Sequence, residues 1–143
     1  MPRTDFYVLN ETNIDARYPY ACRVIDKAYQ RGHKVYVNCT DKTEAHLLDE
    51  MLWTFRDDSF IPHNLHGEGP TPPPPVQLGF DVEPDGFRDI LINLSPEIPT
   101  YFTRFRRVIE VVTQDEKWKE TSREHFRFYR TQGCQLKSHN IEL

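Results

Sequence analysis

The sequence predicts an α/β fold, a three-layer α/β/α domain built around a mostly parallel sheet. Short apolar runs rich in β-branched and aromatic residues alternate with longer segments in which apolar residues recur every three or four positions. Such alternation favours parallel strands joined by helical crossovers, with helices packed on the faces of the sheet. A chain of 143 residues is long enough to bury a core of its own. We therefore expect residues 1–143 to form a single domain.

The chain begins with the pattern of a strand, a helix and a second strand. Residues 6–9 (FYVL) form a short apolar run that ends at the turn-forming residues 10–13. Apolar side chains recur at helical spacing over 15–30, and Gly32 follows where a left-handed C-cap residue belongs. Residues 34–38 (KVYVN) then predict the second strand.

A second helix and a long loop are expected next. Asp41, followed three residues later by Glu44, fits an N-cap with an acidic first turn. The segment 62–75 holds six of the eleven prolines, so we expect a Pro/Gly-rich internal loop there and no domain boundary. The apolar stripe of this second helix is predicted to face the core and consists of Leu47, Leu48, Met51 and Leu52.

The second half of the chain predicts three more strands. Residues 76–80 and 90–94 are apolar runs placed around a turn at 85–86, and the second run is apolar enough for the centre of the sheet. A short helix is expected within 96–105, and the β-branched run over 108–112 predicts a further strand.

Composition argues against several classes of protein. The net charge of -4 argues against broad nucleic-acid binding, although a local basic face can exist on an acidic protein. Cys22, Cys39 and Cys134 are odd in number and widely spaced, which argues against a disulfide framework or a cysteine zinc site. His63 and His66 lie in the predicted loop, where histidines more often form hydrogen bonds than bind metal. We expect no metal ion.

The predicted sheet is Rossmann-like in layout but lacks a phosphate-binding loop. No Gly-x-Gly-x-x-Gly follows the first strand, and the sequence contains no Gly-Lys-Ser/Thr. Residues 67–69 (GEG) fit a structural turn, and no serine lies in a Gly-x-Ser-x-Gly nucleophile elbow. We expect no cofactor and no intrinsic catalysis. The alternative that stays open is a small α/β nucleotide-binding domain or enzyme with an unrecognised site.

The location of the protein is predicted from what its sequence lacks. The N-terminal residues MPRTDFYVLN do not have the apolar stretch of a signal peptide, and no window approaches the roughly 20 apolar residues that span a bilayer. We expect a cytoplasmic protein without membrane contact.

Two aromatic residues near the end of the second helix, Trp53 and Phe60, permit two interpretations. The stripe around Leu48 faces the core, and Trp53 is either part of that core or an aromatic anchor for a partner protein. Tryptophan is enriched among the residues that dominate binding energy at interfaces. The sequence alone leaves both interpretations open.

The last predicted helix, residues 115–132 ended by Gly133, has a basic side. Five basic and two acidic residues between 117 and 130 give a local charge of about +3, which attracts an acidic ligand. The alternative is a solvated face on which Glu120 and Glu124 pair along the helix. The side against the sheet is predicted to consist of Trp118, Ser122, His125 and Tyr129. The adjoining side consists of Lys119, Arg123, Phe126 and Arg130, flanked by Arg127.

Several motifs together resemble one family. The chain reads LDE-x-LW from Leu48, SF-x-PHNL from Ser59 and GEGP from Gly67. At this spacing the motifs resemble the chi subunit of the bacterial DNA polymerase III holoenzyme, an accessory subunit of the clamp-loader assembly without catalysis. The last helix resembles the same family through Lys119, Arg123-Glu124, Phe126, Arg127, Tyr129-Arg130 and Gly133.

The resemblance implies two protein partners. In chi-like proteins the residues that correspond to Trp53 and Phe60 contact the small companion subunit psi, and an accessory repair helicase competes for the same surface. The basic helix receives the acidic C-terminal tail of single-stranded-DNA-binding protein, which ends in phenylalanine. DNA would then be reached only indirectly.

For the acidic tail, the resemblance implies a binding surface on the basic side of the last helix. One residue departs from the family pattern, because Phe126 stands where tyrosine is common and lacks its hydroxyl group. Residues 137–143 match no part of the pattern. The implied tail-binding residues are Lys119, Arg123, Phe126, Arg127 and Gly133.

Overall fold

The computed structural model describes residues 1–56, 60–69 and 71–142 of the chain. Its centre is a sheet with the strand order β3-β4-β2-β5-β6-β1-β7, and each neighbouring pair in it is parallel. The predicted α/β class with a mostly parallel sheet is therefore confirmed. The strands of this sheet are β1 (Arg3–Leu9), β2 (Val35–Asn38), β3 (His63–Leu65), β4 (Val76–Gly79), β5 (Ile90–Asn93), β6 (Arg107–Val112) and β7 (Gln135–Ile141).

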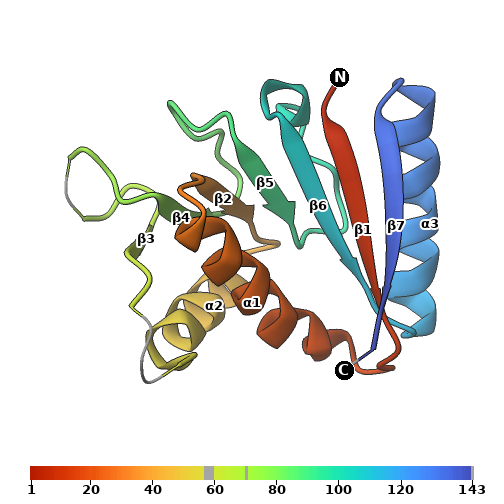
Figure 1. Cartoon of the computed structure of the whole chain (residues 1–143), viewed down its shortest axis with the longest axis horizontal. Coiled ribbons are helices and arrows are strands. Elements are labelled where there is room, and N and C mark those ends of the chain that lie inside the picture. The colour runs from red at the N-terminus through yellow and green to blue at the C-terminus, as the bar shows by residue number, and fades with distance from the viewer. Residues whose placement is uncertain (57–59, 70, 143) are drawn as a thin grey trace.

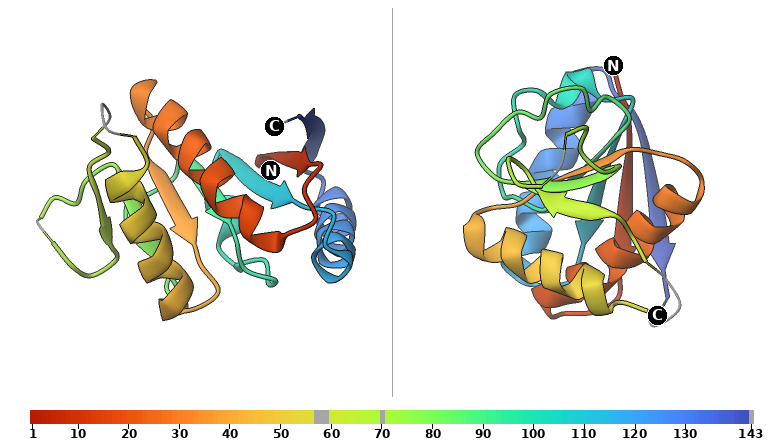
Figure 2. Two further views of the ribbon diagram at one scale, coloured as in Figure 1. Left: turned by 90° about the horizontal axis from the view of Figure 1, so that it is seen from below. Right: turned by 90° about the vertical axis from the view of Figure 1, so that its left-hand side faces the viewer.

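Helices cover both faces of the sheet, which gives the three predicted layers. α1 and α2 lie on one face, and α3 lies on the other, behind β1 and β7 in Figure 1. In the same view neither α1 nor α2 covers β1 and β7, and Figure 2 shows the layers from two further sides. The helices are α1 (Arg17–Gln30), α2 (Lys42–Thr54) and α3 (Glu116–Thr131), with short 3-10 turns η1 (Ile14–Ala16) and η2 (Phe102–Arg104).

The ends of the helices follow the predicted signals. The Asp41 side chain accepts a hydrogen bond from the Glu44 backbone N–H at 2.9 Å and so begins α2. Gly32 has φ +82° just after α1, a conformation that glycine adopts without steric cost. The predicted stripe of α2 is only partly right, because Leu48 and Leu52 are buried whereas Leu47 is 43% exposed.

The core has two parts, one on each face of the sheet. Under α1 and α2 it is aliphatic and contains Val37, Ile92 and Leu48. Under α3 it is aromatic and contains Phe6 and Tyr129, with the ring centroids of these two residues 6.0 Å apart in an edge-on arrangement. Because aromatic pairs have preferred geometries, this second part fixes how α3 lies on the sheet.

Three predictions about strands and loops need correction. The segment 62–75 does not lie wholly in a loop, since β3 (His63–Leu65) pairs with β4 at the edge of the sheet. β4 and β5 are not neighbours around a turn, because β2 lies between them and pairs with both in parallel. Within 96–105 the helix is only the turn η2. Pro72–Pro75 and the other prolines indicated a loop strongly enough to hide a strand of three residues.

The C-terminal residues, which matched no pattern, form the edge strand β7. It pairs in parallel with β1 over its whole length, from Arg3 opposite Gln135 to Leu9 opposite Ile141. Polar side chains dominate it, so its sequence carries no apolar run that predicts a strand. In the part of the chain that the structure describes, no helix is long and apolar enough to cross a membrane.

Candidate functional site

Trp53 and Phe60 form an exposed aromatic pair at the end of α2. Their ring centroids lie 5.6 Å apart, and the two residues remain 55% and 63% exposed. The interpretation of Trp53 as a core tryptophan is therefore wrong. Large apolar rings that stay exposed together are typical of a surface that a partner protein covers. We call the pair of Trp53 and Phe60 the aromatic anchor.

His63 supports the aromatic anchor from below. Its side chain is buried, and its ring centroid lies 4.6 Å from that of Trp53. The two ring nitrogens lie 2.6 Å from the Ile61 carbonyl oxygen and 3.1 Å from that of Asp49. Since both nitrogens face backbone oxygens, His63 holds α2 and β3 together. Among the described residues, no group of three or more histidine, cysteine or acidic side chains is placed to bind a metal ion.

A shallow hollow extends the aromatic anchor along α2. It has a volume of about 350 Å³ and is lined by Trp53, Leu47 and Met51, with Glu50 and Thr54 at its edge. The exposed Leu47, which the helical stripe placed in the core, becomes part of this surface. The sequence contained part of the signal, because Leu47 and Met51 are spaced by four residues and so share one side of α2.

The inner side of α3 is as predicted. The residues that contact the sheet are all buried: Trp118, Ser122, His125 and Tyr129. The Asp115 side chain caps the helix by accepting a hydrogen bond from the backbone N–H of Trp118 at 2.9 Å. The Trp118 indole N–H donates to the Val111 carbonyl oxygen at 2.9 Å, which ties the helix to β6.

A buried network behind α3 fixes the position of the helix. Glu110 on β6 is fully buried and accepts hydrogen bonds from the Tyr129 hydroxyl at 2.7 Å and from the Asn93 amide at 3.1 Å. His125 Nδ1 lies 3.0 Å from the same carboxylate, and Nε2 lies 2.7 Å from the Pro96 carbonyl oxygen. Burial lowers the pKa of His125, but the hydrogen bond and charge of Glu110 outweigh it and raise that pKa. The predictions from sequence missed Glu110.

The basic side of α3 is open, and two of its cations pair with one carboxylate. Glu120 lies 3.6 Å from Arg123 and 3.9 Å from Arg127, and all three side chains are more than half exposed. Exposed pairs of this kind contribute about 1 kcal/mol or less, so an incoming carboxylate can replace Glu120. For Lys119, no ion pair is formed within the described part of the chain. We call this side the basic face.

Phe126 is half-buried within the basic face. Its ring meets that of Phe6 edge-on at 5.2 Å, and it packs on the same apolar cluster as Leu136 of β7. The Arg130 guanidinium carbon lies 5.9 Å from the centre of the ring. The side that the sequence assigns to Lys119, Arg123, Phe126 and Arg130 therefore has a ring that is only partly exposed among its cations. An apolar spot between α3 and β7, with cations around it, is the arrangement that the structure presents.

Gly133 ends α3 and turns the chain into β7. Its φ is +86°, and the backbone N–H of Cys134 donates to the Tyr129 carbonyl oxygen at 3.0 Å while that of Gly133 donates to Arg130 at 3.0 Å. These two bonds form a Schellman motif, in which a glycine is strongly favoured. Gly133 thus fixes where the basic face stops.

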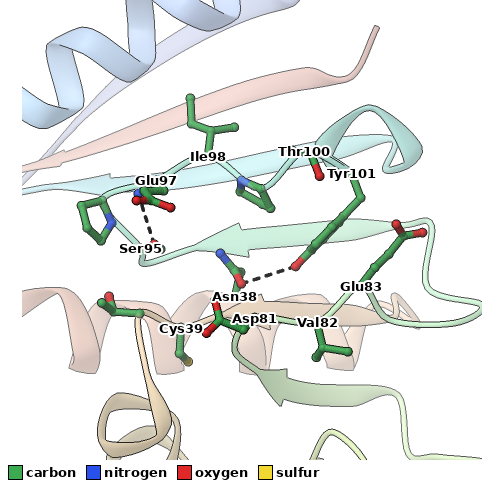
Figure 3. A pocket seen from close by; sticks show the side chains of 13 residues that line it. Asn38, Cys39, Asp81, Val82, Glu83, Ser95, Glu97, Ile98, Thr100 and Tyr101 are labelled. Carbon is green, nitrogen blue, oxygen red and sulfur yellow. Dashed lines mark hydrogen bonds between the residues drawn. The ribbon is translucent and has the colours of Figure 1, made fainter.

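A second hollow lies where ligands commonly bind in α/β proteins, at the carboxyl ends of the parallel strands. It has a volume of about 540 Å³ next to the ends of β2, β4 and β5, and Asn38 and Tyr101 form its base (Figure 3). The described residues that line it include Asp81, Glu83 and Glu97 but no lysine or arginine. Glu83 pairs with Arg104, but the carboxylates of Asp81 and Glu97 still disfavour a nucleotide phosphate.

Comparison with known proteins gives one consistent family. The family model described as DNA polymerase III chi subunit, HolC, matches residues 1–137. The chain is 41% identical over 141 residues to the DNA polymerase III subunit chi of Pseudomonas aeruginosa, covering 99% of this chain and 98% of that protein. The chain belongs to the DNA polymerase III chi subunit family. It is also 34% identical over 141 residues to the subunit of the same name from Escherichia coli K12, covering 95% of this chain and 96% of that protein.

Among solved structures, a similar fold occurs in a chain titled Mss116p DEAD-box helicase domain 2 bound to an RNA duplex. The TM-score is 0.67 at 14% identity, and the match covers 98% of this chain and 64% of that one. At such identity the likeness concerns the fold alone.

Ser59 and Pro70 of the family motifs lie outside the described residues.

Proposed function

We propose that this chi-family chain is a non-catalytic adaptor of the clamp-loader assembly. It joins the psi subunit, held at the aromatic anchor, to the acidic tail of single-stranded-DNA-binding protein, held at the basic face. The observation that carries the proposal is that one domain has two separate exposed surfaces, one aromatic and one basic. Membership of the chi family supports it.

The aromatic anchor suits a partner helix or strand with apolar side chains. Trp53 packs on the buried His63 and against Phe60, so the pair is pre-organised for contact. The hollow beside Leu47 and Met51 offers a place for one apolar side chain of psi. An accessory repair helicase that used the same anchor would compete with psi.

The basic face suits a peptide that ends in acidic residues and phenylalanine. Lys119, Arg123 and Arg127 attract the carboxylates, and the apolar spot at Phe126 accepts the terminal ring. Phe126 offers no hydroxyl group, so the tail is held here by charge and apolar contact. Gly133 bounds the site by ending the helix.

A titration distinguishes this proposal from a nucleotide-binding domain or enzyme. A peptide copied from the acidic tail should bind saturably, and psi should co-elute with the chain on a sizing column. ATP, GTP and NAD, titrated by fluorescence, should show no saturable binding, because the acidic hollow in Figure 3 repels phosphate. Saturable nucleotide binding, or hydrolysis that co-purifies with the chain, would overturn the non-enzymatic assignment.

A further inference from the structure

A groove beside α1 carries basic and aromatic side chains that neither proposed surface uses. It lies between α1 and strands β5, β6 and β1, with a hollow of about 140 Å³. From α1 it is lined by Tyr20, Lys27 and Arg31, which recur at helical spacing and so share one side of the helix. From the sheet it is lined by Tyr7 and Arg107. We call it the α1 groove.

Beside the α1 groove, the part of the sheet formed by β1 and β7 is not covered by α1 or α2 (Figure 1). The register places Lys137 of β7 opposite Asp5 and His139 opposite Tyr7 of β1. Residues directly opposite one another in neighbouring strands point to the same face. The ring of His139 stacks on that of Tyr7 with centroids 4.9 Å apart. The α1 groove therefore opens onto a polar face that reaches the edge strand β7.

Positive charge is concentrated here on an acidic protein. Among the described residues that line or border the groove, the carboxylates are Asp5 and Asp89. Six basic side chains line or border the same groove, an excess of four positive charges on a chain whose total is -4. These six are Arg3, Arg23, Lys27, Arg31, Arg107 and Lys137.

Asp5 balances only part of this charge. It is fully buried and is contacted by Arg107 at 2.7 Å, by Arg3 at 3.1 Å and by His139 at 2.8 Å. Burial raises the pKa of Asp5, but its hydrogen bonds to these partners outweigh that effect and lower the pKa. One ionised carboxylate is thus shared by two guanidinium groups and an imidazole.

Four of the six cations are not paired with Asp5, and three of these four flank the groove. Lys27, Arg31 and Lys137 are exposed, and within the described residues none of them forms an ion pair. Lys27 and Arg31 lie on one side of the groove and Lys137 on the other, so they flank it from α1 and from β7. Cations on both sides of a groove can contact several charges of an extended polyanion, whereas a single small anion would reach only one side.

Aromatic rings lie between these cations. The rings of Tyr7 and Tyr20 are 5.6 Å apart, and the Arg23 guanidinium carbon lies 5.9 Å from the centre of Tyr20. Both tyrosines are only half-buried. Surfaces that bind single-stranded nucleic acid combine cations for the phosphates with aromatic rings on which bases stack.

We propose that the α1 groove and the adjoining face of β1 and β7 bind single-stranded nucleic acid. Its phosphates would contact Lys27, Arg31 and Lys137, and a base would stack against Tyr20. The seven residues of β1 span roughly 23 Å, enough for a short segment of extended strand. This surface lies on the face opposite α3, so it is separate from the basic face. It adds a direct contact to a protein that was expected to reach DNA only indirectly.

Fluorescence anisotropy with a labelled oligodeoxythymidine tests this proposal on the full chain at low salt. Wild type should bind weakly, and log Kd should rise with log salt concentration with a slope of about 0.7 for each phosphate contacted. Lys27→Glu should weaken binding about fivefold or more and reduce that slope. Tyr20→Leu keeps the charge and should weaken binding to a similar degree through lost stacking.

Lys42→Glu on α2 is the matched control, because Lys42 is an equally exposed helical lysine outside the groove. Lys27→Glu and Lys42→Glu change the net charge by the same amount. Because Lys42 lies outside the groove, Lys42→Glu should nevertheless bind the oligonucleotide as wild type does. Equal losses in the two variants, or no salt-dependent binding by wild type, would overturn the proposal. A poly-glutamate peptide that binds as tightly as the oligonucleotide, or full affinity in Tyr20→Leu, would assign the groove to an acidic protein instead. Matching thermal melts show that each variant is folded.

Discussion

Phe60→Ala tests the aromatic anchor, because the exposure of Phe60 sets how much binding energy it can supply. A phenylalanine side chain presents about 200 Å². At 63% exposure, about 130 Å² remains to be covered by a partner. At about 25 cal/mol per Å² this area is worth roughly 3 kcal/mol, or about a hundredfold in Kd for psi. Folding should lose less, since the buried remainder is worth about 2 kcal/mol at most.

The assay is calorimetric titration of psi into wild type and into the variant, after melting curves show that both are folded. Phe128→Ala is the matched control, since Phe128 is 41% exposed on α3 and packs on Phe102 away from the anchor. It should bind psi as wild type does. If Phe60→Ala keeps wild-type affinity, or if Phe128→Ala loses as much, the energy of this interface does not come from the anchor.

Three further predictions concern α3. Arg123→Ala should weaken binding of the tail peptide by up to about 1 kcal/mol, and this loss should shrink as salt rises. Calorimetry at two salt concentrations measures the loss, and a salt-independent wild-type affinity would contradict the role of charge. Tyr129→Phe removes the 2.7 Å hydrogen bond to the buried Glu110 carboxylate. Urea titrations should show a free energy of unfolding that is lower by about 1.5–3 kcal/mol. A loss under about 0.5 kcal/mol would show that this bond contributes little. Folding raises the pKa of His125 above its value of about 6.5 in the unfolded chain. The pair of protonated His125 with Glu110 therefore stabilises the folded protein fully at pH values below about 6.5, and this stability is lost as pH rises through the pKa of the folded state. NMR titration of His125 with a midpoint below 6.5 would refute that sign.

The elements with strong local signals were predictable from the sequence. Asp41 caps α2 as its spacing from Glu44 indicates, and Gly133 stops α3. These signals work because each depends on contacts within a few residues. The inner side of α3 was equally clear, since its strict helical spacing leaves one choice of face.

Pairing over long distances was not predictable. β7 has few apolar residues, and only its register with β1 makes Lys137 and His139 part of the basic surface beside α1. The place of β2 between β4 and β5 likewise depends on topology rather than on any local motif. Local patterns also could not decide between core and anchor for Trp53, because its contacts are with Phe60 and with His63 at the start of β3.

The most direct test of the adaptor account is whether both partners bind at once. Sedimentation velocity should follow a fluorescent acidic-tail peptide mixed with psi, with and without the chain. The account predicts that the label sediments with psi only when the chain is present, and that Arg123→Ala weakens this co-sedimentation while psi stays bound. If psi displaces the peptide, or if the peptide never sediments with the psi complex, the two surfaces do not act as a bridge.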